Sequence, residues 1–197
     1  LKEGAEWAVN KGFGKKEDLE RTEDGGRMSY ANPSAESEKA LQRGFSQLGS
    51  LGSGNHFLEI QYVAEIQNKE VAKTLGIEKE EQVVVMLHCG SRGLGHQVAA
   101  DSIREMEDTY GWKHLTDREL VNAPISSDLG KKYLGAMAAA ANFAFCNRQM
   151  ILEWIRQTFV KIFGADVKLD MVYDVTHNMS KVEEYVIDGK KRKLKNS

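Results

Sequence analysis

Cysteine is scarce in this chain of 197 residues, which has only Cys89 and Cys146. The two lie far apart and follow no C-x-x-C spacing, so neither a disulfide framework nor a closed structural zinc site is predicted. A reducing cytoplasm is therefore the expected location of the protein.

The sequence also lacks a surplus of charge and a long hydrophobic run. Its 27 basic and 29 acidic residues give a net charge of -2, so any polyanion must be held by a local patch rather than by the overall charge. The longest apolar stretch is interrupted by Asn142, Asn147, Arg148 and Glu153, and no signal-peptide run opens the chain, so no membrane span or membrane partner is predicted. A G-x-x-x-x-G-K-[ST] motif is missing, which argues against a Walker-type nucleotide site.

What is present is an ordinary globular composition, with 41% apolar and 28% charged residues. The length suits one domain over residues 1–197, and no internal repeat, low-complexity tract or linker divides it. The chain begins at Leu1 inside a helical pattern and finishes in the basic segment 190–195. We therefore expect it to be a fragment of a longer protein.

Helices are predicted where apolar residues recur with helical spacing and where capping residues precede them. The main expected helices cover residues 93–109 and 126–163, and a short helix is expected to start within residues 32–38 and to end at about residue 45. The helix at 126–163 is the dominant one; it contains the alanine-rich run 136–141, and Gly135 is a candidate position for a bend or a break. The glycine-rich and charged segment 15–27 is expected to be an exposed loop.

Strands are expected in the segments 56–63, 82–88, 168–175 and 181–188. The segment 82–88 is apolar enough to be buried on both faces of a sheet. Alternation in 181–188 is typical of the first arm of a hairpin. Together these patterns predict an α+β fold, in which a mixed β-sheet is flanked by helices and one helix is long and alanine-rich.

Three histidines, His56, His88 and His177, each border an apolar strand-like run and lie beside glycine, serine or asparagine. We expect them to converge at one edge of a sheet. Three imidazoles bind borderline metals and leave coordination positions open for water, a phosphate oxygen or a substrate. For any one of them, the alternative is a buried histidine that satisfies a hydrogen bond. His96, inside a predicted helix, and His114, in a charged loop, are interpreted as not being ligands.

Groups suited to phosphate lie next to His88. The glycines of residues 90–95 allow backbone amides to approach an anion at a helix N-terminus, and Arg92 can bind phosphate oxygens with two parallel hydrogen bonds. The alternative is a simple bend that starts a helix. Without the neighbouring histidine, that alternative would be favoured.

Polar side chains also flank the other two histidines. Asn55 and Asn178 offer amide groups that can hydrogen-bond a phosphate or orient a ligand. Glu59 would point away from His56 in a strand, and a carboxylate in that position suits the N–H groups of a guanine edge. A solvent-facing strand residue is the alternative for Glu59.

Four segments resemble, in order and approximate spacing, the RtcB family of RNA ligases, which act in tRNA splicing. They are Gly-Asn-His-Phe-Leu-Glu at 54–59, His-Cys-Gly-Ser-Arg-Gly-Leu-Gly-His at 88–96, Asp-Val-Thr-His-Asn at 174–178, and the alanine-rich segment 133–148. The resemblance spans nearly the whole chain. It implies an RtcB-like fold and GTP- and Mn²⁺-dependent joining of RNA 3'-phosphate or 2',3'-cyclic phosphate ends to 5'-hydroxyl ends, through a covalent GMP-histidine, in tRNA splicing and RNA repair.

The resemblance also implies roles for individual residues. His56, His88 and His177 match manganese ligands, with two ions expected; Asn55, His56, Glu59, His177 and Asn178 match positions around the guanylate; and Arg92 matches a residue that holds an RNA phosphate. The implied partners are RNA, as tRNA halves or broken RNA ends, GTP, and an activating protein.

Two motifs of the family have no counterpart in the sequence. The Asp-x-x-Cys motif, which supplies a carboxylate and a metal-bridging thiolate, is expected upstream, and the His-Gly-Ala-Gly-Arg-like motif with the guanylated histidine is expected downstream. No catalytic residue is therefore assigned in this chain, which is expected to be inactive alone. Cys89 is interpreted as a small structural residue, not as the missing thiolate. A metal-dependent phosphoesterase or nuclease, and a non-catalytic metal- and nucleotide-binding scaffold, stay open as alternatives.

Overall fold

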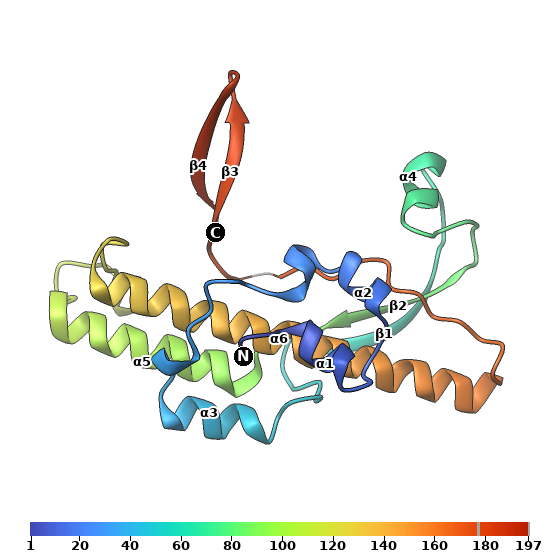
Figure 1. Cartoon of the computed structure of the whole chain (residues 1–197), viewed down its shortest axis with the longest axis horizontal. Coiled ribbons are helices and arrows are strands. Elements are labelled where there is room, and N and C mark those ends of the chain that lie inside the picture. The colour runs from blue at the N-terminus through green and yellow to red at the C-terminus, as the bar shows by residue number, and fades with distance from the viewer. Residues whose placement is uncertain (177, 197) are drawn as a thin grey trace.

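A computed structural model describes residues 1–176 and 178–196 and shows a helical molecule arranged along one long helix, α6 (Figure 1). The elements in chain order are α1 (Ala5–Asn10), α2 (Lys16–Glu20), η1 (Glu23–Gly26), η2 (Pro33–Ala35), α3 (Glu38–Phe45), β1 (Phe57–Tyr62), α4 (Lys69–Thr74), β2 (Val83–His88), α5 (Arg92–Tyr110), η3 (Arg118–Leu120), α6 (Asp128–Phe163), β3 (Lys181–Ile187) and β4 (Lys190–Asn196). The α+β class and the long alanine-rich helix are confirmed.

Helix α6 forms the centre of the core because its small residues allow other helices to pack closely on it. It begins where the Ser127 hydroxyl accepts a hydrogen bond from the amide of Gly130, an ordinary N-cap. It continues through Gly135 without the break considered from the sequence. A side chain at this glycine would place a Cβ 2.8 Å from the Cβ of Asn32, so the glycine serves close packing rather than bending.

The core consists of three clusters of buried side chains along α6. One joins it to α3 and α5 through Ala40, Leu94, Val98, Ala136, Ala140 and Phe143. A second joins it to α1 through Ala5, Met28, Ala138, Ala141 and Phe145. A third contains Cys89, Ile151 and Ile155. Packing along a single helix thus ties the N-terminal elements to those that carry the predicted site.

Two buried asparagines of α6 fasten distant loops to it. Asn142 accepts a hydrogen bond from the amide of Met28 and donates to the carbonyl of Leu1. Asn147 accepts from the amides of Gly49 and Ser50 and donates to the carbonyl of Gly90. Buried amide groups need such partners, and those of Asn147 lie in the loops that lead to His56 and follow His88.

The strands form two separate antiparallel pairs, β1 with β2 and β3 with β4, rather than the single mixed sheet of the prediction. The β3–β4 hairpin, predicted from residues 181–188, projects away from the helices (Figure 1). Strand β2 was expected to be buried on both faces, and this was wrong: Val83 and Met86 are exposed. Apolarity alone does not bury a strand when no layer covers its second face.

The strand predicted at 168–175 is also absent from the described residues. This segment makes a single parallel bridge, between Asp174 and Thr22. The amide of Asp174 donates to the carbonyl of Arg21, and its carbonyl accepts from the amide of Glu23. Two backbone hydrogen bonds position the segment beside η1, but no neighbouring strand extends the pairing.

The segment 15–27 is folded, not an exposed loop as predicted. It contains α2 and η1, and Asp18, Thr22 and Gly26 within it are buried. Asp18 is buried because Arg156 of α6 donates to both of its carboxylate oxygens. The glycines and charges of this segment gave no sign of that distant partner.

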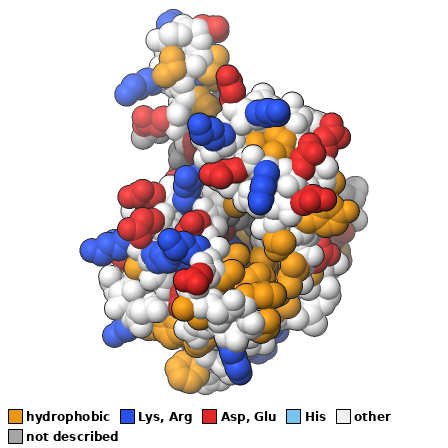
Figure 2. All heavy atoms as spheres, turned by 90° about the vertical axis from the view of Figure 1, so that its right-hand side faces the viewer, with side chains coloured by type: hydrophobic (Ala, Val, Ile, Leu, Met, Phe, Trp, Pro, Cys, Tyr) orange, Lys and Arg blue, Asp and Glu red, His pale blue; other side chains and the backbone are white. Residues whose placement is uncertain are grey.

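Large hydrophobic side chains are exposed at one end of the molecule. Ile162 and Phe163 end α6, and Ile60 and Tyr62 lie on β1. Figure 2 views this end and shows hydrophobic side chains gathered beside acidic and basic ones.

Among the described residues, no helix is both long enough and apolar enough to cross a membrane.

Candidate functional site

The β1–β2 pair brings two of the three predicted histidines together. His88 is the last residue of β2 and lies opposite Phe57 in the register, so His56, immediately before β1, is its neighbour. The two imidazole centroids are 6.2 Å apart, and the Phe57 ring stacks on His88 at 5.3 Å. His177, the third predicted ligand, lies outside the described residues.

Arg92 lies against His56 at the start of α5. Its Nη1 is 3.2 Å from Nδ1 of His56, and its Nε donates to the hydroxyl of Ser50 at 3.3 Å. Any side chain at Gly52 would collide with both Arg92 and His56, so this glycine permits the contact. Burial, together with the charge of Arg92, lowers the pKa of His56. The imidazole is therefore kept in the neutral form that can bind a metal.

The two imidazoles fit a divalent metal site in donor type but supply only part of its ligands. A working metal site usually has at least three protein ligands, and no group of three His, Cys, Asp or Glu side chains able to hold an ion occurs within residues 1–176 and 178–196. Nδ1 of neutral His56 accepts the Arg92 contact, so its proton is on Nε2. A metal on Nδ1 would replace Arg92 there. A metal on Nε2 would move the imidazole proton to Nδ1, which could then no longer accept a hydrogen bond from Arg92.

Cys89 is part of the packing beneath this turn. Its thiol is buried and donates to the carbonyl of Leu51 at 2.9 Å, and Asn147 donates to its sulfur at 3.2 Å. Burial raises the pKa of the Cys89 thiol. A protonated, fully packed thiol is consistent with the structural role predicted for it.

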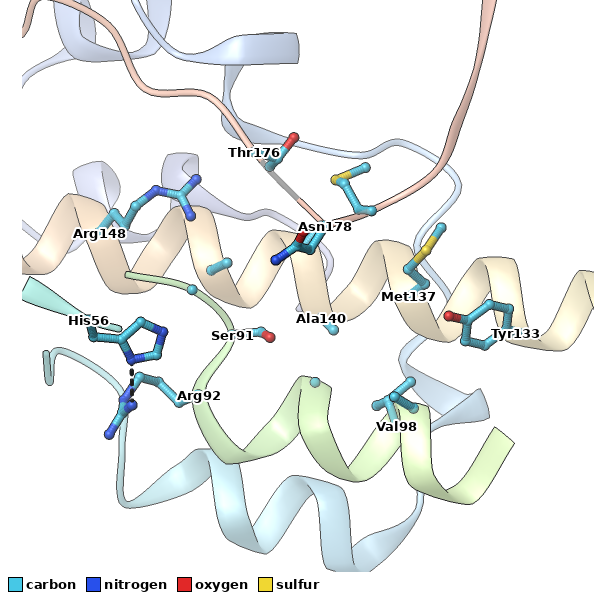
Figure 3. A pocket seen from close by; sticks show the side chains of 16 residues that line it. His56, Ser91, Arg92, Val98, Tyr133, Met137, Ala140, Arg148, Thr176 and Asn178 are labelled. Atoms are coloured by element: carbon cyan, nitrogen blue, oxygen red, sulfur yellow. Dashed lines mark hydrogen bonds between the residues drawn. The ribbon is translucent and has the colours of Figure 1, made fainter. Parts of the chain in front are cut away.

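A cavity of about 290 Å³ lies between α5 and α6, next to His56 and Arg92 (Figure 3). The segment that follows Asp174 borders it from the other side, through Thr176, Asn178 and Met179. Small residues open the space between the two helices; those lining it are Gly90, Ser91, Gly95, Ala99, Ala140, Ala141 and Ala144.

Arg148 lines the same cavity, and no functional role was predicted for it. It extends from α6 and is only 7% exposed. Its Nε donates to Asp174 at 2.6 Å and its Nη1 to the carbonyl of Cys89 at 3.2 Å. Burial raises the pKa of Asp174, and the charge of Arg148 offsets part of that rise. Arg148 thus links α6 to both the histidine turn and the segment leading to Asn178. The sequence signal was a charged residue in an alanine-rich, otherwise apolar helix.

A network around Glu23 holds that segment in place. Glu23 accepts hydrogen bonds from the amide and the hydroxyl of Thr176, at 2.8 and 2.6 Å, and from Lys181 at 2.6 Å. Burial acts to raise the pKa of Glu23, but the hydrogen bonds from Lys181 and Thr176 outweigh it and lower the pKa. The anionic carboxylate therefore anchors Thr176 at the cavity.

Of the other predicted site residues that the structure describes, only Asn178 lines the cavity. It has a positive φ of 55°. Asn55 and Glu59 are exposed and do not line it; the Glu59 carboxylate accepts a hydrogen bond from Gln61 at 2.7 Å. His96 and His114 are exposed and also lie away from the lining. His56, Arg92 and Asn178 thus share one cavity, while the roles expected for Asn55 and Glu59 stay predictions.

Known proteins resemble the chain over almost its entire length. The sequence model of the family described as tRNA-splicing ligase RtcB matches residues 1–194. A tRNA-splicing ligase RtcB of Thermococcus kodakarensis is 55% identical over 202 residues, covering 98% of this chain and 41% of the relative. Proteins of the same name from Pyrococcus abyssi and Archaeoglobus fulgidus are 55% and 51% identical, each over 98% of this chain and over 22% and 41% of their own lengths.

The chain therefore spans less than half the length of these relatives. The resemblance found from the four segments is confirmed by the match over residues 1–194. With this coverage, and with His56, His88 and Arg92 gathered at one end of the β1–β2 pair, the chain belongs to the RtcB family of tRNA-splicing ligases.

Proposed function

We propose that this chain is the metal- and phosphate-binding part of an RNA ligase. The ligase joins RNA 3'-phosphate or 2',3'-cyclic phosphate ends to 5'-hydroxyl ends in tRNA splicing and RNA repair, with GTP and Mn²⁺. The observation that carries the proposal is the gathering of His56, His88 and Arg92 at one end of the β1–β2 pair, beside a cavity between α5 and α6. Membership of the RtcB family supports RNA as the substrate.

His56 and His88, with His177, are the proposed manganese ligands. Manganese held by these residues would polarise phosphate oxygens and neutralise their negative charge. Arg92 is proposed to hold the RNA phosphate, because it lines the cavity and a guanidinium matches phosphate geometry. If His56 held a metal, Nη1 of Arg92, which now contacts His56, would be available to that phosphate.

Asn55, His56, Glu59, His177 and Asn178 are proposed to surround the guanylate. Of these, His56 and Asn178 line the cavity, which supports a nucleotide close to the metal. A guanylated histidine is proposed outside this chain, since no His-Gly-Ala-Gly-Arg motif occurs in the sequence.

Residues 1–197 are proposed to form one domain, the central part of a larger catalytic domain that works with an activating protein. The share of the relatives that the chain covers supports this. Cys89 and Cys146 are both free and buried, which fits a reducing compartment, and the cytoplasm is the proposed location.

Recognition of RNA ends tests this function. With Mn²⁺ present, we expect the chain to bind an oligoribonucleotide with a 3'-phosphate at least about tenfold more tightly than one with a 3'-hydroxyl, because a hydrogen bond to a charged group contributes roughly 1.5–3 kcal/mol. Fluorescence anisotropy measures both affinities. The preference should fall in Arg92→Ala and stay in the exposed control Arg104→Ala. Equal affinity for the two oligonucleotides would contradict the proposal.

A further inference from the structure

Arg148 has a donor that the fold leaves unused. Nε and Nη1 are bonded to Asp174 and to the carbonyl of Cys89, whereas Nη2 is buried and has no hydrogen-bond partner among the described residues. Buried polar atoms almost always have partners, and an unpaired one calls for an explanation. Leaving a charged donor unpaired costs more than leaving a neutral one. Since Arg148 lines the cavity, a ligand in the cavity is the natural partner for Nη2.

The lining of the cavity selects the charge of such a ligand. Among the described residues, its only formally charged lining groups are Arg92 and Arg148, and no carboxylate lines it. Ser91 and Tyr133 add hydroxyl groups, whereas the hydroxyl of Thr176 already donates to Glu23. Two guanidinium groups suit a tetrahedral oxyanion. A cation would find no negative partner among these groups.

The cavity has two chemically different ends (Figure 3). Arg92 and Arg148 lie toward one end, on opposite sides, one from the start of α5 and the other from α6. Tyr133, Met137 and Val98 lie toward the other end. This polarity fits a ligand with a phosphate at one end and a flat, partly apolar group at the other. A volume of about 290 Å³, near the lower limit of ordinary ligand sites, fits a single nucleotide.

We propose that Arg148 binds the phosphate of a nucleotide in this cavity, as a second phosphate-binding residue opposite Arg92. Asp174 acts as a positioning residue, because its hydrogen bond to Nε orients the guanidinium so that Nη2 is the donor left for the ligand. Tyr133 and Met137 lie where the sugar and base extend. The identification of this nucleotide as an RNA 3' end rests on the proposed function, whereas the phosphate site follows from the cavity alone.

Titration calorimetry with inorganic phosphate and with uridine 3'-monophosphate tests the site. Arg148→Lys keeps the charge but loses the planar fork, and we expect at least a tenfold loss of affinity for both probes. The matched control Arg104→Lys changes an exposed arginine of α5 and should bind as the unaltered chain does. Uridine without phosphate should bind far more weakly than its 3'-monophosphate.

A second variant tests the site with both arginines intact. Ala144 lines the cavity one helical turn before Arg148, and Ala144→Leu fills the space without changing any charge. We expect phosphate binding to fall at least tenfold while the circular dichroism spectrum is retained. The Nε–H NMR signal of Arg148 is identified as the arginine signal that is missing from the spectrum of Arg148→Lys. In the unaltered chain, phosphate should shift this signal, so the measurement does not depend on phosphate binding by the variant.

The possible failures are distinct. Undiminished phosphate affinity in both Arg148→Lys and Ala144→Leu, or an unshifted Arg148 signal at saturating phosphate, would overturn the phosphate site. If phosphate affinity depends on Arg148 as expected but RNA with a 3'-phosphate binds no better than RNA with a 3'-hydroxyl, the phosphate site stands and the proposed function fails.

Discussion

Arg148 and Arg156 lie on the same helix, are both buried, and each donate to a carboxylate at 2.6 Å. Each nitrogen of the Arg156 guanidinium has a partner: Nη1 and Nη2 donate to the two oxygens of Asp18, and Nε donates to the carbonyl of Leu169. Arg148 has partners for Nε and Nη1, but not for Nη2 among the described residues. The difference separates an arginine that completes the core from one that has a donor left for a ligand.

Loss of the Asp18–Arg156 pair should reduce stability more than loss of the Asp174–Arg148 pair. Asp18→Ala leaves the guanidinium of Arg156 buried without its carboxylate, and it removes the acceptor of Gln149. Breaking a buried pair in this way costs about 3–5 kcal/mol of unfolding free energy. Urea unfolding measures the loss. Asp174→Ala should cost less, because Asp174 accepts one hydrogen bond from Arg148, whereas Asp18 accepts two from Arg156 and one from Gln149; an equal or larger cost would remove the distinction between the two arginines.

The same pair should give a smaller, pH-dependent effect. Burial acts to raise the pKa of Asp18, but hydrogen bonds from Arg156, Lys15 and Gln149 outweigh it, so the pKa is lower in the folded state. Such a carboxylate stabilises the fold above its unfolded pKa of about 3.9, and this stability is lost as the pH falls through the folded pKa.

The comparison of Asp18→Asn with the unaltered chain measures this effect. Their difference in unfolding free energy should be largest near pH 7 and shrink below about pH 4. A difference that is the same at pH 7 and pH 3 would show that the ionised form of Asp18 is not what Arg156 stabilises.

Local patterns predicted the elements that depend on neighbouring residues. The helix predicted to end at about Phe45, the strands predicted at 56–63 and 82–88, and the long helix ending at Phe163 agree closely with the structure. The failures depended on distant partners: Asp18 is buried by Arg156, and the segment 168–175 lacks the strand that would have paired with it.

The candidate site shows the same division. His56, His88 and Arg92 were predicted because they lie in glycine-rich turns beside strands, and the antiparallel register brings them together. Arg148 was missed because its role requires knowing which of its donors are already bonded, and those bonds reach Asp174 and Cys89 across the fold. The sequence alone does not show which donors of Arg148 are already bonded.

Manganese affinity tests the central claim most directly, namely that His56 and His88 act together as metal ligands. Electron paramagnetic resonance follows a titration of the chain with Mn²⁺. His56→Ala and His88→Ala should each weaken Mn²⁺ binding by at least about tenfold, because the loss of residues that only support metal ligands already weakens binding by about that much. His114→Ala, at an exposed position away from the cavity lining, should bind like the unaltered chain. Equal affinity in all three variants would contradict the claim.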